Sequence, residues 1–235
     1  AKVKLKAGMF GTISLNKNWQ FKIDKLGEGN GKQWYSQNWI DARIVNVPHT
    51  WNIEKENEMH YGWGWYQKKL FVPTKWKSKQ LILQFGAINH TSAIYINGKK
   101  VKENIGDGFN KFYINLDGML KFNAENTITV ACNNDFGKMK VPYANSFDWP
   151  NDGGLIREVA LLVSDRPAMA FAHITPKLDV ATNQGDVKIR IGLQETNANK
   201  NLKFKIQIKE ENQVTHNVVL QTILKPVWEN GEAVL

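Results

Sequence analysis

The segment "SAIYINGKKV", residues 92–101, carries the clearest local signal for the fold. Apolar and polar side chains alternate on both sides of Asn97-Gly98, and a period of two is typical of a half-buried strand. Asn-Gly is strongly favoured in two-residue β-hairpin turns, because both of its residues tolerate a positive φ. The segment therefore predicts two strands joined by a tight turn.

The same alternation runs outward through the first two thirds of the chain, and helical periodicity is almost absent. Further strands are predicted at residues 12–23, 65–72, 80–88, 112–116, 126–134 and 155–163. Short strands at this spacing indicate an all-β protein built as a two-sheet sandwich or jelly roll.

The composition changes near residue 166, at "SDRPA". Four plainer strands follow, predicted at residues 171–180, 186–196, 202–210 and 216–224. An immunoglobulin-like sandwich needs about 100 residues, so the remaining stretch is short for one. We predict a first domain at 1–165 and a second, immunoglobulin-like and truncated domain at 166–235.

Composition limits the function classes. The formal net charge is +9, but the lysines are scattered among acids and form no stripe, so we predict no nucleic-acid partner. No stretch approaches the roughly 20 apolar residues of a membrane span. Cys132 is the only cysteine and lies in an apolar strand, where it is predicted to be a buried small hydrophobe. The compartment stays unassigned, with a periplasmic or secreted location weakly favoured over the cytoplasm.

Two long irregular stretches, 24–64 and 135–154, separate the strands and hold a surplus of aromatic residues. Disordered loops are poor in aromatics, so both stretches are predicted to be packed. Tryptophan either fills a core or stacks on flat ligands such as sugar rings, and eight of the nine tryptophans lie before residue 150.

The motifs that would mark a complete catalytic apparatus are missing. "GEGNGK" (27–32) lacks the spacing and the Ser/Thr of a phosphate-binding loop. The five histidines form no metal-binding pattern, and no Gly-x-Ser-x-Gly elbow occurs. The residues therefore predict no catalytic group, no metal site and no cofactor in this chain.

Three stretches in order resemble the N-terminal region of glycoside hydrolase family 2, which holds β-galactosidases, β-glucuronidases and β-mannosidases. "VPHTWN" (47–52) with "YGWGWYQKKLFVP" (61–73) resembles the family's proline-led loop and following strand. "LQFGAINHTSAIYINGKKV" (83–101) resembles its hairpin, and "DWPNDGGLIREVALL" (148–162) resembles the segment that closes its first domain.

This resemblance implies a galactose-binding-like jelly-roll domain, an immunoglobulin-like domain, and a following (β/α)8 barrel with both catalytic glutamates. Retaining glycosidases need two carboxyl groups about 5–5.5 Å apart. Since the barrel lies outside residues 1–235, the chain alone is predicted to be inactive, as the front end of a β-glycosidase. We expect β-galactosidase activity in the parent enzyme, which acts on terminal β-linked sugars.

The resemblance also assigns substrate contacts in the full-length enzyme to Asn52 and Asp148, which would reach the sugar next to the cleaved bond. Amide and carboxylate groups suit a polyol. Trp149 is the best candidate for stacking on a sugar. In some family members the matching aspartate also touches an alkali cation. The alternative from the residues alone is structural, with Asn52 capping a turn and Asp148 accepting bonds in an Asx turn.

A different class of protein also fits: a free-standing carbohydrate-binding module or lectin-like protein, using the same jelly roll without a catalytic partner. In the enzyme interpretation the partners are a carbohydrate substrate and the barrel of the same polypeptide, and an oligomer is compatible with the sequence.

Overall fold

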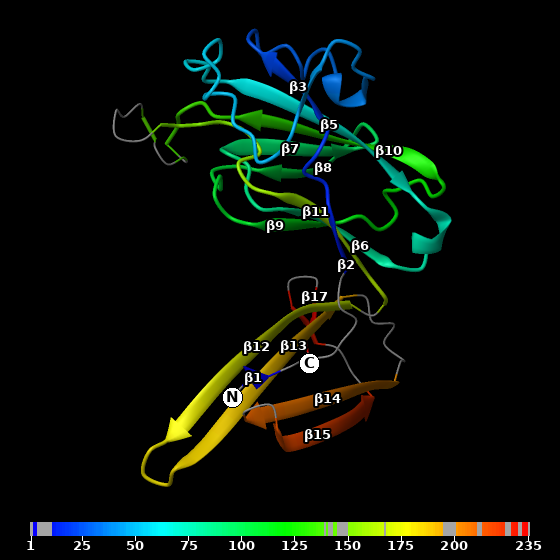
Figure 1. Cartoon of the computed structure of the whole chain (residues 1–235), viewed down its shortest axis with the longest axis vertical. Helices are drawn as coiled ribbons and strands as arrows, with labels where there is room; N and C mark the ends of the chain where they lie inside the picture. The colour runs from blue at the N-terminus through cyan, green and yellow to red at the C-terminus, as the bar shows by residue number, and fades with distance from the viewer. Residues whose placement is uncertain are drawn as a thin grey trace. The chain divides into compact units, whose positions relative to one another are not determined.

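A computed structural model describes most of the chain. The described residues are 2–3, 11–138, 140, 143–144, 150–166, 168–194, 201–210, 213–223, 227–229 and 232–234. They divide into two compact units, the larger at Thr12–Val163 and the smaller at Ala1–Gly11 with Ser164–Leu235 (Figure 1). The described residues are all-β apart from two short 3-10 turns, η1 (Trp34–Ser36) and η2 (Thr74–Trp76), so the predicted fold class is confirmed.

The larger unit contains a six-stranded sheet in the order β4-β3-β5-β10-β7-β8. Two ten-residue strands, β5 and β10, form its centre and pair antiparallel along their whole lengths. The bounds are β3 Trp19–Asp24, β4 Arg43–Val45, β5 Trp63–Val72, β7 Thr91–Ile96, β8 Lys99–Asn104 and β10 Ala124–Asn133.

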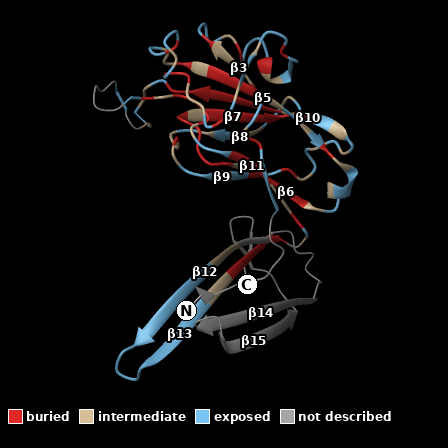
Figure 2. Cartoon of the chain, in the orientation of Figure 1, coloured by how far each residue is buried: buried red, intermediate tan, exposed pale blue. Residues whose placement is uncertain are grey.

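A four-stranded sheet in the order β2-β11-β6-β9 forms the second layer. Its strands are β2 Gly11–Ser14, β6 Gln80–Phe85, β9 Phe112–Asn115 and β11 Val159–Ser164. Alternate apolar side chains of the two sheets meet in one core, which Figure 2 shows as buried strand residues. Tyr66, Ile94 and Val130 come from the six-stranded sheet, and Leu83, Phe85 and Leu161 from the four-stranded one. The larger unit is therefore a β-sandwich.

The predicted Asn-Gly hairpin is present. Strands β7 and β8 pair antiparallel, and both turn residues have positive φ, 51° at Asn97 and 80° at Gly98. The Asn97 side chain also accepts a hydrogen bond from the Thr127 amide at 3.0 Å, so the turn is anchored to β10.

The observed strands differ from the predicted ones by a few residues at several ends, for example at β6, which ends at Phe85, and two predicted segments differ most. The segment 12–23 is split, because β2 and β3 belong to different sheets and the chain crosses between them at Asn16–Asn18, where Asn18 has a φ of 60°. The segment predicted at 155–163 enters its sheet only at Val159. Before that, the Leu155 carbonyl accepts a hydrogen bond from the His49 amide at 2.8 Å, which ties it to a loop.

The outer face of the six-stranded sheet carries a second, smaller aromatic cluster under the 24–42 segment. Its buried members are Trp34, Trp39, Trp65, Ala93, Tyr95 and Ala131. The Trp39 indole donates to the Trp34 carbonyl at 2.9 Å, and the Trp65 indole donates to Asp24 at 3.1 Å. The long stretch 24–64 is thus packed as predicted, which explains why it is rich in aromatics.

The smaller unit has two sheets, β1-β14-β15 and β12-β13-β17-β16. β12 and β13 form a long antiparallel hairpin (Figure 1). All four strands predicted after residue 166 are found. The bounds are β1 Lys2–Val3, β12 Ala168–Asp179, β13 Gln184–Gln194, β14 Asn201–Glu210, β15 Gln213–Ile223, β16 Val227–Glu229 and β17 Glu232–Val234.

Candidate functional site

Loops at one end of the sandwich are joined by four buried asparagines, Asn52, Asn89, Asn134 and Asn151, which we call the asparagine cluster. Asn52 comes from the predicted proline-led loop and is 8% exposed. Its amide nitrogen donates to the carbonyls of Glu58 at 3.0 Å and His60 at 3.1 Å, closing its own loop. Its carbonyl oxygen accepts from the Asn134 side chain at 3.0 Å and the Gly153 amide at 2.8 Å. Asn52 therefore connects three segments that are distant in sequence.

The other members extend these connections. Asn134 follows directly after β10, and its side chain donates to the Asn151 carbonyl at 2.7 Å while accepting from the Gly62 amide at 2.9 Å. The Asn151 side chain donates back to the Asn134 carbonyl. Asn89 donates to the Asn151 side chain at 3.2 Å and to the Asp152 carbonyl at 2.7 Å. The paired amides of Asn52, Asn134 and Asn151 make the loop geometry specific and rigid. The buried side-chain oxygen of Asn89 has no hydrogen-bond partner among the described residues.

Trp51 fills the space beneath this cluster and is fully buried. Its indole nitrogen donates to the His60 carbonyl at 3.1 Å. A Cβ on Gly153 would lie 2.1 Å from the Trp51 ring, and a Cβ on Gly64 would lie 2.6 Å from it. The first glycine of the "NDGGL" motif is thus required by close approach to this ring.

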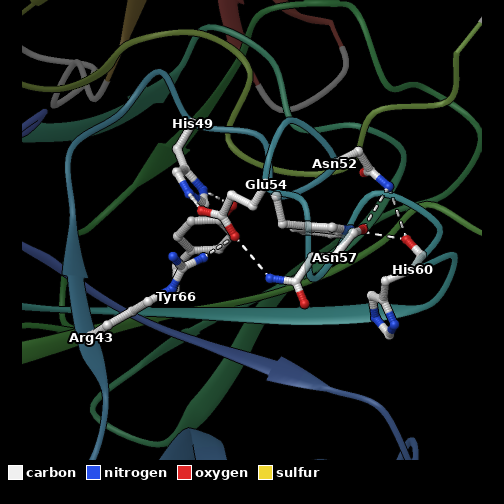
Figure 3. A network of polar contacts seen from close by, with 8 residues as sticks. Arg43, His49, Asn52, Glu54, Asn57, His60 and Tyr66 are labelled. Atoms are coloured by element: carbon white, nitrogen blue, oxygen red, sulfur yellow. Dashed lines mark hydrogen bonds and ion pairs between the residues drawn. The ribbon is translucent and has the colours of Figure 1, made fainter.

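A second polar network lies beside the cluster and holds the 49–57 segment against β5 (Figure 3). His49 Nδ1 lies 2.7 Å from the Tyr66 hydroxyl, and His49 Nε2 lies 3.1 Å from Glu54. Glu54 also accepts hydrogen bonds from Arg43 and, at 2.8 Å, from Asn57. The carboxylate of Glu54 is therefore surrounded by three donors.

These contacts set the ionisation of the network. Burial lowers the pKa of His49 below 6.5, although Glu54 opposes this shift. Partial burial raises the pKa of Glu54, but the hydrogen bonds from Arg43, Asn57 and His49 outweigh it and leave the pKa below its usual value. Burial raises the pKa of Tyr66 well above 10. At neutral pH the network thus joins a neutral histidine, a neutral tyrosine and an ionised Glu54–Arg43 pair, which is an arrangement for holding a loop.

The predicted site residues can be placed only in part. Asn52 lies at the centre of the asparagine cluster, whereas Asp148 and Trp149 lie outside the described residues. Asn134 and Asn151 were missed by sequence reasoning. No sequence signal set them apart, because Asn is common in turns and "CNNDF" at 132–136 has the composition of an ordinary turn after a buried strand. Within the described ranges no group of three or more His, Cys, Asp or Glu side chains could hold a metal ion.

In the part of the chain that the structure describes, no helix is long and apolar enough to span a bilayer.

Two solved structures that are similar to this chain are named β-glucuronidases. A β-glucuronidase from an uncultured Clostridium species has a TM-score of 0.72 at 26% identity, over 96% of this chain and 41% of that chain. The Bacteroides uniformis β-glucuronidase has a TM-score of 0.74 at 24% identity, over 91% of this chain and 26% of that chain. The fold of this chain is therefore that of one portion of these larger proteins.

The sequence identifies the family. Residues 12–165 match the model described as glycosyl hydrolases family 2, sugar binding domain. The protein therefore belongs to glycoside hydrolase family 2 and corresponds to the N-terminal part of its glycosidases, which confirms the resemblance found in the sequence.

Curated relatives show how much of such an enzyme is present. A β-glucuronidase of Bacteroides fragilis is 30% identical over 162 residues, which are 67% of this chain and 21% of that protein. A β-galactosidase of Thermoanaerobacterium thermosulfurigenes is 27% identical over 207 residues, 85% of this chain and 28% of that protein. The chain spans about a fifth to a third of the length of the curated relatives that it matches.

Proposed function

We propose that this chain is the sugar-binding front end of a retaining family 2 β-glycosidase whose catalytic (β/α)8 barrel lies elsewhere in the same polypeptide. The family match over residues 12–165 carries this proposal. In it, residues 1–165 are the jelly-roll domain and residues 166–235 are the first part of an immunoglobulin-like domain. The two carboxyl groups needed for retaining hydrolysis belong to the barrel.

The proposed substrates are terminal β-linked sugars. The sequence favoured a β-galactosidase, and one relative carries that name. More of the similar relatives are named β-glucuronidase, among them proteins of Bacteroides fragilis and Streptococcus agalactiae. Both glycones are therefore to be tested, with β-glucuronides first.

In the proposed enzyme, Asn52 and Asp148 contribute to sugar binding, and Trp149 stacks on the sugar. Asn151 lies three residues after Asp148 in the sequence, and its bonds to Asn134 hold the chain in place at that point. The Asn52 amide already has protein partners on both its nitrogen and its oxygen. Those bonds support a role for Asn52 in positioning the loop, alongside any contact that it makes with sugar.

Kinetics of the full-length protein test the proposal. We expect hydrolysis of p-nitrophenyl β-D-glucuronide or β-D-galactoside, with retention of configuration at the anomeric carbon. Asp148→Ala should lower kcat/KM by about a hundredfold or more, since a charge-assisted contact to the reacting sugar is lost. A thermal unfolding curve like that of the wild type would show that the fold is intact. Absence of a barrel in the gene downstream of residue 235 would contradict the proposal and favour a free-standing carbohydrate-binding module.

A further inference from the structure

A polar pocket of about 280 Å³ opens on the outer face of the six-stranded sheet, away from the asparagine cluster. Three segments of the larger unit line it: the η1 region, the central strands β5 and β10 with the turn before β10, and the β7–β8 turn. The lining residues are Tyr35, Ser36, Gln37, Asn38, Gln67, Lys69, Asn97, Gly98, Lys121, Glu125 and Thr127. Its size is near the lower end of the range for small-molecule sites, about 300–1,000 Å³.

The first wall of the pocket is fixed by hydrogen bonds to the sheet. The buried side chain of Gln67 donates to the Gln37 carbonyl at 3.0 Å and to the Thr129 hydroxyl at 3.2 Å. The Tyr35 ring stacks on Tyr95 with centroids 4.4 Å apart and planes within 4° of parallel. These contacts hold residues 35–37 in place over β5 and β10.

The second wall is the β7–β8 turn. A Cβ on Gly98 would lie 3.2 Å from the Ser36 side chain, so the turn packs closely against the first wall. The Asn97 side chain donates to Asn126 at 2.9 Å, which anchors the turn to β10. Both walls of the pocket are therefore held in place, and a ligand would have to order only exposed side chains of the lining, such as Asn38 and Lys121.

The lining chemistry suits a hydroxylated ligand. The side-chain amide of Asn38 and the hydroxyl of Thr127 can donate and accept hydrogen bonds. The Gln37 amide nitrogen already donates to the Lys32 carbonyl at 2.6 Å, so Gln37 is an acceptor through its side-chain oxygen. Small-molecule sites are usually mostly apolar, whereas this one is lined mainly by polar side chains. A polyol can exchange its water hydrogen bonds for these groups, and an apolar ligand cannot.

The charges of the lining favour an anionic group on that ligand. Lys69 and Glu125 lie 3.2 Å apart as an ion pair and neutralise each other. Lys121 is the third charged residue of the lining, and it has no ion pair among the residues that the structure describes. A carboxylate on the ligand would meet this ammonium group in a charge-assisted hydrogen bond.

The pocket is separate from the loops of the candidate site. Lys69 pairs with Thr127 in the sheet, and Trp63 pairs with Asn133 next to the asparagine cluster. Six residues of strand at about 3.3 Å each put the two places about 20 Å apart. A ligand can therefore bind in the pocket without any ligand at the asparagine cluster.

We propose that this pocket is a second carbohydrate site, which binds a carboxylate-bearing oligosaccharide, with Lys121 contacting the carboxylate and Asn38 contacting sugar hydroxyls. It is independent of hydrolysis, because all of its residues lie in the larger unit. Binding by residues 1–235 and turnover by the full-length protein can therefore fail separately.

Isothermal titration calorimetry of the 235-residue chain tests the site with trigalacturonate, neutral maltotriose and sodium sulfate. We expect trigalacturonate to bind, and maltotriose and sulfate to bind at least tenfold more weakly. Lys121→Met should weaken trigalacturonate binding about tenfold, since a hydrogen bond to a charged group is lost. Asn38→Ala should weaken it severalfold, and Lys121→Arg should retain it. Lys75→Met changes an exposed lysine in η2, outside the lining, and should leave binding unchanged.

Three results would overturn the proposal. The first is an absence of binding heat with trigalacturonate at millimolar concentration. The second is equal affinity for trigalacturonate and either maltotriose or sulfate, which would contradict the ligand class. The third is wild-type affinity in both Lys121→Met and Asn38→Ala, with unchanged thermal unfolding, which would place the binding elsewhere.

Discussion

Trp51 lies directly against Gly153, although the two residues are 102 positions apart in the sequence. A Cβ on Gly153 would lie 2.1 Å from Cζ2 of the indole, and the Trp51 amide donates to the Gly153 carbonyl at 3.2 Å. The proline-led loop and the segment before β11 are thereby joined. Through the neighbouring Asn52–Gly153 bond of 2.8 Å, this contact is also part of the loop scaffold of the candidate site.

Gly153→Ala should destabilise the protein. The added methyl group would overlap the buried Trp51 ring, and overpacking of a core typically costs about 1–3 kcal/mol. Urea denaturation followed by tryptophan fluorescence measures the free energy of unfolding. Gly31→Ala is the matched control, since its nearest neighbour would be 3.6 Å from the new Cβ. Equal stability of the two variants would show that the ring moves aside without cost.

Asn52→Ala should lower the free energy of unfolding by about 2–4 kcal/mol, because it leaves buried partners such as the Gly153 amide without an acceptor. Asn52→Asp should be at least as destabilising at pH 7. It keeps the acceptor but turns a buried negative charge toward the carbonyls of Glu58 and His60. Thermal unfolding monitored by circular dichroism measures both effects. Asn30→Ala, at an exposed turn, is the control, and a wild-type melting temperature for Asn52→Asp would refute the donor role.

Stability should fall as the pH drops below about 6.5, in part through His49. Burial lowers its pKa in the folded protein, so between the unfolded value of 6.5 and the lower folded value only the unfolded chain takes up the proton. The contribution is complete above pH 6.5 and is lost as the pH falls through the folded pKa. Glu54, whose pKa lies below 4.5, contributes to the pH dependence of stability only in a more acidic range. Unfolding free energies from pH 5 to 8 should show a smaller slope in His49→Gln, and identical slopes would contradict this assignment.

Cys132 should be unreactive in the native protein. It is fully buried, its thiol donates to the Asn89 carbonyl at 2.8 Å, and burial raises its pKa to about 12. The reactive thiolate is therefore scarce as well as inaccessible. Ellman's reagent at pH 8 should titrate close to no thiol in native protein and one per chain in guanidinium chloride. Rapid labelling without denaturant would show that this end of β10 opens readily.

Local sequence determined the elements that depend on neighbouring residues. Alternation located the strands because a strand with one buried face repeats every two residues, and Asn97-Gly98 set its turn because few residue pairs accept two positive φ angles. The ordered motifs around Pro48, Asn97 and Arg157 also identified the family. Alternation did not predict the end of a strand where a sheet partner decides it, as at Val159.

Only the tertiary structure decided what the loops do. Asn52, Asn134 and Asn151 look like ordinary turn residues in the sequence, because the hydrogen bonds that define them span 17 to 101 residues. The pocket beside Lys121 was equally invisible, since its lining comes from segments between residues 35 and 127 that only the sheet brings together. Alternation records which side of a strand is buried. It does not record which distant loop covers that strand, because that depends on packing between side chains far apart in the chain.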